Sequence, residues 1–331
     1  MKDLKLFSQH LLKLDAAHEV DKICGGLRDL LAHQLKRRGL VVGLSGGIDS
    51  SVTAALAVRA IGPQRVLGLL MPERHSAVDT LPLSGLVAQH LGITTIREDI
   101  SATLEAVGCY RRYQDAIRTL VPEYADDWRS KIVISSAMDS RGFSLFYLVV
   151  QGPVGTEQKI RLPAATYLEI VAATNFKQRT RKMLEYYHAD RLHFAVAGTP
   201  NRLEYDQGFF VKLGDGAADV KPIAHLYKSQ VYQLAEYLEL PEEIRKRPPT
   251  TDTYSLPQGQ DEFYFSIPYQ IMDLCLYGKN HSVAAGEVAA AVGLTEEQVG
   301  SLYADIDTKR STTRYLHLEP LLVEKVGEIE L

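Results

Sequence analysis

A short polar turn near residue 45 carries the residue types that bind phosphate. The sequence SGGIDS spans residues 45–50 and follows the apolar run at residues 40–44. A strand that enters such a turn brings unpaired backbone N–H groups and a helix N-terminus to one point, and both favour an anion. The turn is neither a Walker P-loop, since no Lys-Ser/Thr follows a GxxxxG, nor a GxGxxG fingerprint. We therefore expect a phosphate site whose positive charge comes from elsewhere in the chain.

Asp49 within this turn has two interpretations. An acid in the first turn of a helix is poorly placed to meet a phosphate directly, so a bridging Mg²⁺ would reconcile the two. The alternative is an ordinary helix start, in which Ser45 caps the helix and Asp49 complements the helix dipole. The residues of the turn leave both interpretations open.

The elements around the turn alternate between strand and helix. We expect buried strands at residues 40–44, 65–71, 94–97 and 192–197, and helices at residues 48–61, 78–91, 164–188, 226–238, 283–292 and 296–305. This alternation predicts an α/β fold with a doubly wound, Rossmann-like parallel sheet and a helical C-terminus. Ligands of such sheets bind at the carboxyl ends of the strands, so a second glycine turn at residues 198–201 indicates the same site.

Two segments depart from this alternation. Residues 4–38 have helical spacing of apolar side chains, which predicts two helices that break near Gly25 and Gly26. Residues 101–163 hold a polar, aromatic-rich stretch and then a predicted β-hairpin of residues 143–151 and 159–162. No repeat or linker divides the chain. We therefore expect one domain over residues 1–331 with an insertion at residues 101–163.

Composition excludes several classes of protein. The chain has 331 residues with 37 basic and 41 acidic side chains, so it lacks the basic excess of a dedicated nucleic-acid binder. Cys24, Cys109 and Cys275 are too scattered for a disulfide framework or a zinc site. No apolar run is long enough to span a bilayer, and no signal segment is evident. We expect a cytoplasmic protein with neither nucleic acid nor membrane as its partner.

Longer sequence motifs reduce the number of functions that the turn could serve. SGGIDS resembles the SGGxDS loop of the N-type ATP pyrophosphatases, the adenine nucleotide alpha hydrolase-like superfamily, which cleave ATP between its α and β phosphates to adenylate a substrate. Further segments resemble the NAD synthetase signature in order and spacing: NFKQRTR at 175–181, GTPNRLE at 198–204, GFFVKLGDGAAD at 208–219, LYKSQV at 226–231, PPTTD at 248–252 and QDE at 260–262. By this resemblance the chain is identified as a member of the NAD synthetase family.

The resemblance implies a role for each matched residue. The expected ATP contacts are Gly43, Leu44, Ser45, Gly46, Gly47, Ile48, Asp49, Ser50, Thr199, Lys228 and Thr250. Asp49 and Glu204 would share Mg²⁺, and together with Lys228 they would form the catalytic centre. The expected contacts of the nicotinate dinucleotide are Arg179, Lys212, Asp219, Thr308 and Lys309.

The implied reaction is ammonia-dependent NAD synthesis in two steps. The nicotinate carboxylate of deamido-NAD attacks the α-phosphorus of ATP, and ammonia then displaces AMP to leave an amide. Such chemistry depends on positioning and charge neutralisation more than on side-chain acid–base groups. Fused relatives that hydrolyse glutamine need an additional glutaminase domain with a nucleophilic cysteine, and we expect none here. Ammonia would be free or come from a separate glutaminase, and the family resemblance implies a homodimer.

Four departures from the family pattern affect the acceptor half. The insertion at residues 101–163 is the largest. The QDE motif is followed by Phe263, Tyr264, Phe265 and Ser266 in place of a further acid and Leu-Gly. Thr308 replaces the His that often precedes the C-terminal Lys. The GTPN turn leads into Arg202-Leu203 in place of the usual small residues or Lys-Ser.

These departures leave an alternative open, a diverged ligase that adenylates another carboxylate. A non-catalytic ATP-binding regulator is disfavoured because Asp49 and Glu204 are both present. A tRNA thiolase is disfavoured because the chain lacks a CxxC motif.

Overall fold

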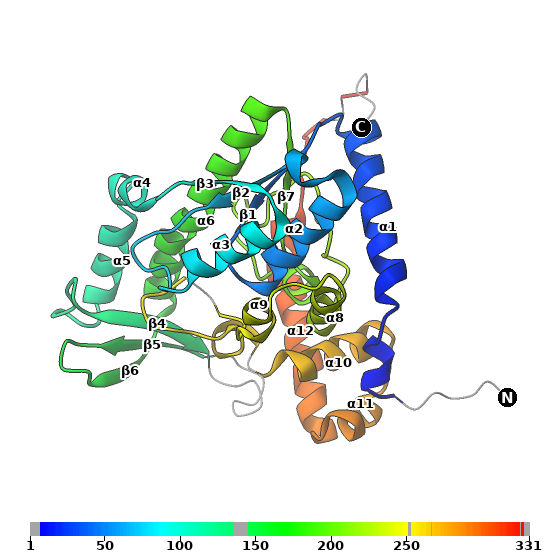
Figure 1. Ribbon diagram of the computed structural model, residues 1–331. Coiled ribbons are helices and arrows are strands. Elements are labelled where there is room, and N and C mark those ends of the chain that lie inside the picture. Colours follow the sequence, from blue (N-terminus) through cyan, green and yellow to red (C-terminus); the bar gives the residue numbers. More distant parts are fainter. Residues whose placement is uncertain (1–6, 135–144, 251–252, 266, 325, 328–331) are drawn as a thin grey trace.

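A parallel four-stranded sheet lies at the centre of the protein (Figure 1). The computed structural model describes residues 7–134, 145–250, 253–265, 267–324 and 326–327. The strand order is β3-β2-β1-β7, with β1 at Leu40–Gly43, β2 at Val66–Leu70, β3 at Thr94–Arg97 and β7 at Ala195–Ala197. All neighbouring pairs are parallel. Because β2 and β3 lie on one side of β1 and β7 on the other, the strand order reverses at β1, where ligands bind in such sheets.

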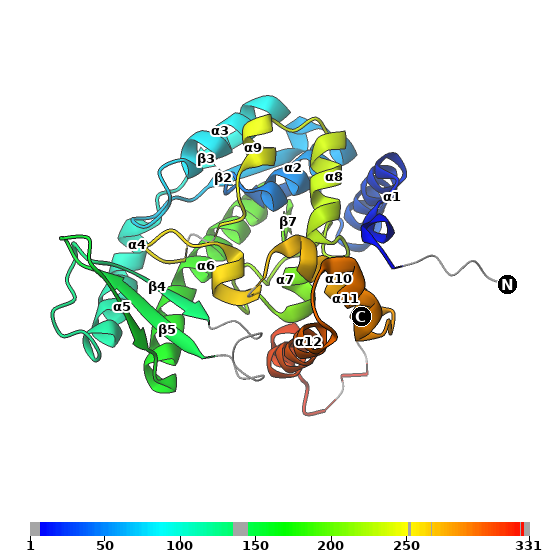
Figure 2. The ribbon, with the colours of Figure 1, turned by 90° about the horizontal axis from the view of Figure 1, so that it is seen from below.

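Helices cover both faces of this sheet, as Figures 1 and 2 show, so the predicted doubly wound arrangement is confirmed. Neighbouring side chains on a strand point to opposite faces. Leu40 and Val42 therefore pack in one core, with α1 (Ala16–Asp29), α2 (Ile48–Ile61), α3 (Thr80–Leu91), α8 (Lys228–Tyr237) and α9 (Glu242–Lys246). Val41 packs in the opposite core, with α4 (Ser101–Ala106), α5 (Cys109–Arg118) and α6 (Ala164–Leu192).

The N-terminal helix corrects one prediction. The break expected near Gly25 and Gly26 is wrong, because α1 runs without interruption through both glycines. The apolar stripe of α1 holds the helix together through its contacts in the core with α2, which outweigh the low helix propensity of glycine. The chain bends earlier, between the 3₁₀ turn Gln9–Leu12 and the N-cap residue Asp15 of α1.

The insertion folds as a second, antiparallel sheet beside α6 (Figure 1). Its strands are β4 (Arg129–Ile134), β5 (Phe146–Gln151) and β6 (Glu157–Arg161), in the order β4-β5-β6. The predicted hairpin is confirmed as β5 and β6, while residues 143–144 lie outside the described part of the chain. Helix α5 and strand β4 were not predicted. Helix α5 packs against the sheet that contains β4 and against the first turns of α6. These elements share a core that is separate from the cores of the central sheet.

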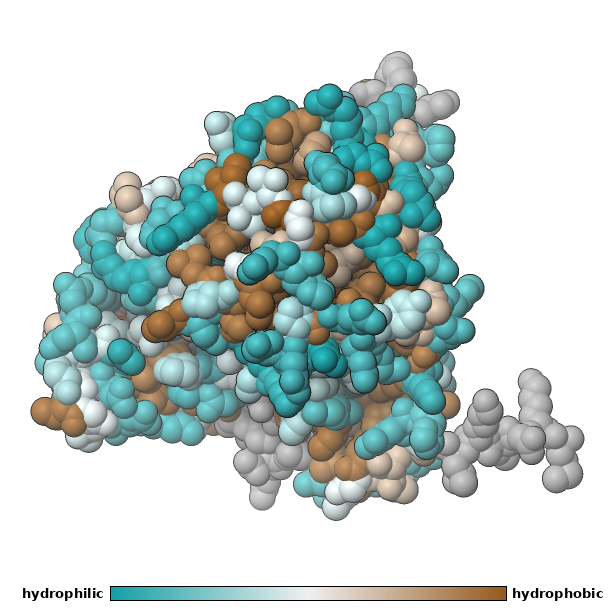
Figure 3. Space-filling view, viewed as in Figure 1, coloured by the Kyte–Doolittle hydropathy of each residue, from teal (hydrophilic) through white to brown (hydrophobic). Residues whose placement is uncertain are grey.

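Four helices near the C-terminus form a further core. They are α7 (Arg202–Gln207), α10 (Tyr269–Asn280), α11 (Ala285–Val292) and α12 (Glu296–His317), and Phe7 and Leu12 from the N-terminus complete the cluster. Helix α10 was not predicted, and α12 is longer than the predicted helix at residues 296–305. Hydrophilic side chains cover most of the face in Figure 3. Within the described residues, no helix is both long and apolar enough to cross a membrane.

Candidate active site

A cavity of about 530 Å³ lies at the carboxyl ends of β1 and β7. Its walls include the turn after β1, the turn after β7, the middle of α6 and the loop after α9, which are far apart in the sequence. Both predicted glycine turns therefore reach one site. Of the predicted ATP contacts, all line the cavity except Gly46. Of the predicted acceptor contacts, Arg179 and Lys212 line it.

The turn after β1 is built for a backbone that faces a ligand. Gly47 is the N-cap residue of α2 and no side chain caps this helix, so the interpretation in which Ser45 is the cap is wrong. Ser45 instead stabilises the turn itself: its Oγ accepts from the Gly47 N–H at 3.3 Å and lies 3.1 Å from Ser50 Oγ. The residues of the first turn of α2 line the cavity. Their N–H groups remain available to an anion.

Gly46 has a structural role in this turn. Its φ is +69°, and a Cβ there would lie 2.7 Å from Leu83 Cβ of α3. We expect Gly46→Ala to lower the free energy of unfolding by about 3 kcal/mol, because it adds a steric clash to the strain of a left-handed backbone. Gly92→Ala is the matched control. Its φ is +63° but nothing lies within 4 Å of the added Cβ, so only about 1 kcal/mol should be lost. Equal losses in urea denaturation would contradict the clash.

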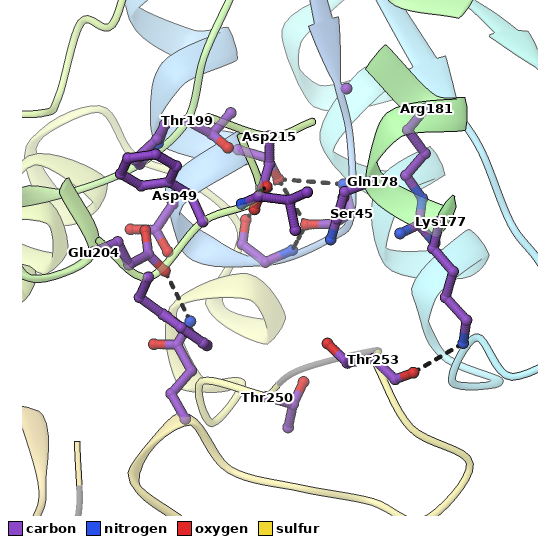
Figure 4. Close-up of a pocket in the computed structure, with 18 of the residues that line it drawn as sticks. Ser45, Asp49, Lys177, Gln178, Arg181, Thr199, Glu204, Asp215, Thr250 and Thr253 are labelled. Carbon is purple, nitrogen blue, oxygen red and sulfur yellow. Dashed lines mark hydrogen bonds between the residues drawn. The ribbon is translucent and has the colours of Figure 1, made fainter. Parts of the chain in front are cut away.

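Three charged side chains meet between the two turns. Figure 4 shows two of them, Asp49 and Glu204, close to each other. Lys228, the first residue of α8, is only 2% exposed and forms an ion pair with Asp49 Oδ2. Asn201 joins the turns, because its Nδ2 donates to Asp49 Oδ1 at 3.1 Å. Asn201 also caps α7 in a capping box, in which Glu204 Oε2 accepts from the Asn201 N–H at 3.1 Å. The side chains of Asp49, Glu204 and Lys228, to which the family resemblance assigned a shared centre, thus lie in one cluster.

Burial perturbs the protonation of this cluster. Burial and the neighbouring Asp49 carboxylate raise the pKa of Glu204 to about 8. Burial alone would lower the pKa of Lys228, but Asp49 and Glu204 outweigh it and raise that pKa above its usual range. With its pKa at about 8, Glu204 is largely protonated near neutral pH, so the Asp49 carboxylate and the Lys228 ammonium balance each other. A bound cation would favour the ionised form of Glu204 and give the site a second carboxylate.

The residues fit a shared Mg²⁺ on these grounds. Mg²⁺ in nucleotide sites takes one or two protein carboxylates and completes its shell with phosphate oxygens and water. Asp49 and Glu204 supply two carboxylates beside the predicted phosphate turn. Among the described residues no group of three or more His, Cys, Asp and Glu side chains could hold a metal. Phosphate oxygens of the nucleotide would therefore have to complete the coordination.

Two residues that the sequence did not indicate contribute to the charges of the site, one by positioning a cation and the other by adding one. Asp273 of α10 is fully buried and accepts from the N–H groups of Lys228 at 3.1 Å and Ser229 at 2.7 Å, so it caps α8 from another element. Burial raises the pKa of Asp273 to about 6. Arg247 donates to the Ser45 carbonyl at 3.1 Å and pairs with Asp79 at 3.0 Å, which brings a second positive charge to the phosphate turn. The PPTTD motif beside Arg247 was the only signal that could have found it.

Helix α6 contributes buried charged groups to the same cavity. Lys177 forms an ion pair with Glu73 at 2.8 Å, and Tyr110 donates to the other Glu73 oxygen at 2.8 Å. Although burial disfavours the charge on Glu73, Lys177 holds the Glu73 pKa below its ordinary value. One turn further along α6, Lys182 pairs with Glu185 at 2.5 Å. The sequence indicated this helix as a motif but predicted a role only for Arg179.

The remaining acceptor residues lie outside the cavity lining. Asp219 accepts from the Val196 N–H of β7 at 2.7 Å. Thr308 is exposed on α12, and its Oγ donates to the Ala304 carbonyl at 2.9 Å. Lys309 is buried, pairs with Asp305 at 2.6 Å and donates to the Tyr264 carbonyl at 2.7 Å.

Lys212 lines the cavity but is already engaged by the C-terminal segment. Its Nζ donates to the carbonyls of Tyr315 at 2.7 Å and Leu318 at 3.0 Å. Arg179 donates to the Lys212 carbonyl at 3.3 Å. These two residues bring positive charge to this part of the cavity.

Aromatic rings replace the family's further acid and Leu-Gly in the acceptor half. Tyr264 stacks on Phe209 at a centroid distance of 4.6 Å, and Phe146 of β5 stacks on Tyr167 at 4.3 Å. All four rings line the cavity. The inserted hairpin thus contributes to the site of its own chain.

Comparisons with known proteins identify a family and close relatives of this chain. A model of the NAD synthase family matches residues 19–134 and 154–313. The NH(3)-dependent NAD(+) synthetase of Mesorhizobium japonicum is 61% identical over 318 residues, which cover 96% of this chain and 100% of that protein. The protein of the same name from Rhizobium meliloti is 61% identical over 325 residues, 98% of this chain and 97% of the relative.

Solved structures share the fold. The NMN synthetase from Francisella tularensis has a TM-score of 0.63 at 21% identity and covers 94% of this chain and 99% of its own. The NH3-dependent NAD synthetase from Campylobacter jejuni has a TM-score of 0.61 at 22% identity, with coverage of 94% and 100%. At these identities the likeness concerns the fold alone.

Proposed function

Because the chain belongs to the NAD synthase family, we propose that it is an ammonia-dependent NAD⁺ synthetase. It adenylates the nicotinate carboxylate of deamido-NAD⁺ with ATP and forms the amide with ammonia, releasing AMP and pyrophosphate. The observation that carries the proposal is the convergence of Asp49, Glu204 and Lys228 on a phosphate-binding turn. That arrangement suits ATP cleavage between the α and β phosphates.

The residues of the site act by positioning and charge. A carboxylate oxygen of the acceptor attacks the α-phosphorus, and the bond to the pyrophosphate oxygen breaks. The N–H groups of the turn at residues 45–50 and the Lys228 ammonium hold the phosphates in place. Asp49 and Glu204 would hold Mg²⁺, which neutralises phosphate charge when bound. Ammonia then forms the C–N bond as the C–O bond to AMP breaks, so no side-chain nucleophile is required.

The acceptor contacts divide into two groups on this proposal. Arg179 and Lys212 bind the dinucleotide directly, because they line the cavity and carry positive charge. Asp219, Thr308 and Lys309 act from outside the cavity. Asp219 fixes the end of β7, and Lys309 fixes the backbone beneath the Tyr264 ring.

Assembly and location follow as further proposals. Three large apolar residues of helix α6 are exposed to solvent: Leu168 is 64% exposed, Met183 58% and Tyr187 59%. This exposure favours a homodimer that covers the helix. Light scattering that returned the mass of one chain would contradict the dimer.

The three cysteines bear on the location of the protein. Cys24, Cys109 and Cys275 are free and buried, as expected of packing residues in a reducing cytoplasm. Ammonia would reach the site free or from a separate glutaminase.

A single assay tests the function. The protein is incubated with MgATP, ammonium chloride and deamido-NAD⁺, and AMP and NAD⁺ are followed by chromatography. We expect one AMP for each NAD⁺, and no NAD⁺ when ammonium is omitted. AMP release that another carboxylate stimulates, without NAD⁺ from deamido-NAD⁺, would instead support the diverged ligase.

A further inference from the structure

The insertion is hydrogen-bonded to the loop that follows Thr250. Strand β4 lies at the edge of its sheet, so one row of its backbone groups is unpaired by β5. The Ser130 N–H donates to Ser255 Oγ at 2.9 Å, and the Leu256 N–H donates to the Ser130 carbonyl at 3.1 Å. Residues 253–260, here called the docked loop, therefore pair with the free edge of β4.

Side chains strengthen this contact. Lys131 of β4 donates to the Pro257 carbonyl at 3.2 Å and pairs with Glu262 at 2.9 Å. Gln258, which is 2% exposed, donates to the Ile132 carbonyl. The Tyr254 ring is buried in the core of the insertion. The backbone contacts hold the loop in one register along β4. The buried Tyr254 ring holds it against the core of the insertion.

A second contact holds the docked loop from the side of α6. Lys177 donates to the Thr253 carbonyl at 2.9 Å, and Figure 4 shows this side chain pointing from α6 to the loop. The ion pair with Glu73 keeps the Lys177 ammonium in this place. The loop is thus held by two elements, β4 and α6.

The docked loop reaches the ATP half of the site at its far end. Thr250 forms an antiparallel bridge with Gly259, and Gln260 Nε2 donates to Glu204 Oε1 at 2.9 Å. Thr250 and Gln260 both line the cavity. A shift of the loop away from β4 would therefore move a predicted phosphate contact and release a hydrogen bond to a predicted metal ligand.

We propose that the insertion holds the docked loop in the conformation that binds ATP, which makes Ser130, Lys131 and Ser255 positioning residues for the nucleotide. The inference rests on the proposed function in taking ATP as the ligand. A loop that is ordered before ATP arrives loses less conformational entropy on binding, so the affinity is higher. The insertion thereby acts on ATP, although none of these three residues lines the cavity.

Two substitutions test the proposal on the full-length protein. Ser255→Ala removes the acceptor of the Ser130 N–H, and Lys131→Met removes the bonds to Pro257 and Glu262. We expect each to raise the Kd for MgATP about five-fold in titration calorimetry and to leave the Kd for deamido-NAD⁺ unchanged. Ser255→Thr, which keeps the hydroxyl, should retain the original affinity. Lys159→Met is the control for Lys131, since Lys159 lies on β6 over the Tyr147 ring.

Hydrogen exchange separates this role from a general loss of stability. The Leu256 amide should exchange faster in Ser255→Ala and Lys131→Met than in Lys159→Met, with Tm within about 2 °C of the parent. Unchanged exchange, or faster exchange with an unchanged Kd for MgATP, would overturn the proposal. A parent protein that binds MgATP but makes no NAD⁺ would refute the proposed function, while the calorimetric comparison would still decide the role of the loop.

Discussion

Asp49→Asn is expected to slow pyrophosphate release by about 10³-fold while the chain remains folded. The Asn side chain keeps the size of Asp and the acceptor for Asn201 Nδ2, but it loses the charge that faces Lys228 and a shared Mg²⁺. The fold survives because Lys228 retains a counter-ion. Removal of the Asp49 charge takes away one of the two causes that raise the pKa of Glu204, which favours the ionised form of Glu204 near the ammonium.

Pyrophosphate release and the far-ultraviolet circular dichroism spectrum together measure this outcome. Asp115→Asn is the control, since Asp115 is an exposed acid on α5 whose ion pair with Arg118 is solvated. It should leave the rate unchanged. Normal turnover of Asp49→Asn at low magnesium concentration would refute the metal assignment.

Glu73→Gln is expected to have the largest effect on stability, a loss of about 3–5 kcal/mol in the free energy of unfolding. The Glu73 and Lys177 side chains are 0% and 4% exposed, so the substitution leaves a buried ammonium without its counter-ion. Within the described residues, Lys177 forms no ion pair with any Asp or Glu side chain other than Glu73. The loss should appear as a lower urea midpoint and a Tm lower by several degrees.

A neighbouring exposed pair provides the control. Arg74 and Glu105 lie 2.7 Å apart but are 49% and 55% exposed, so Glu105→Gln should cost less than about 1 kcal/mol. The double variant Glu73→Gln/Lys177→Met should recover much of the lost stability, because it removes the stranded charge. A similar loss of stability in Glu73→Gln and Glu105→Gln would show that burial does not determine how much the Glu73–Lys177 ion pair contributes to stability.

Local sequence was sufficient for the elements next to the site. The predicted bounds of α2 and β3 agree with the structure, and the predicted glycine turns both line the cavity. These features depend on short-range geometry: an apolar run forms a buried strand, and a turn such as the one at Gly46 needs a positive φ. The family relationship was also predictable, because the motifs occur in the order and with the spacing of the family.

Sequence periodicity failed where packing overrides local preference. Gly25 and Gly26 do not end α1, because the buried stripe of that helix packs on α2. Strand β4 was missed because its charged and apolar residues resemble the polar stretch around it. Its conformation depends on partners on both edges, β5 and the docked loop.

What the sequence determined by itself is the set of chemical groups available to this protein: a glycine turn after a buried strand, the Asp49 and Glu204 carboxylates, and the Lys228 ammonium. From these groups it predicted a phosphate site. Only the tertiary structure decided which groups meet. Asp273, for example, caps α8 from 45 residues away, and Lys177 reaches Thr253 across 76 residues. The physical reason is that side-chain type and local backbone geometry are encoded by neighbouring residues. Burial, pKa and the pairing of distant charges arise only when the chain packs and excludes water from them.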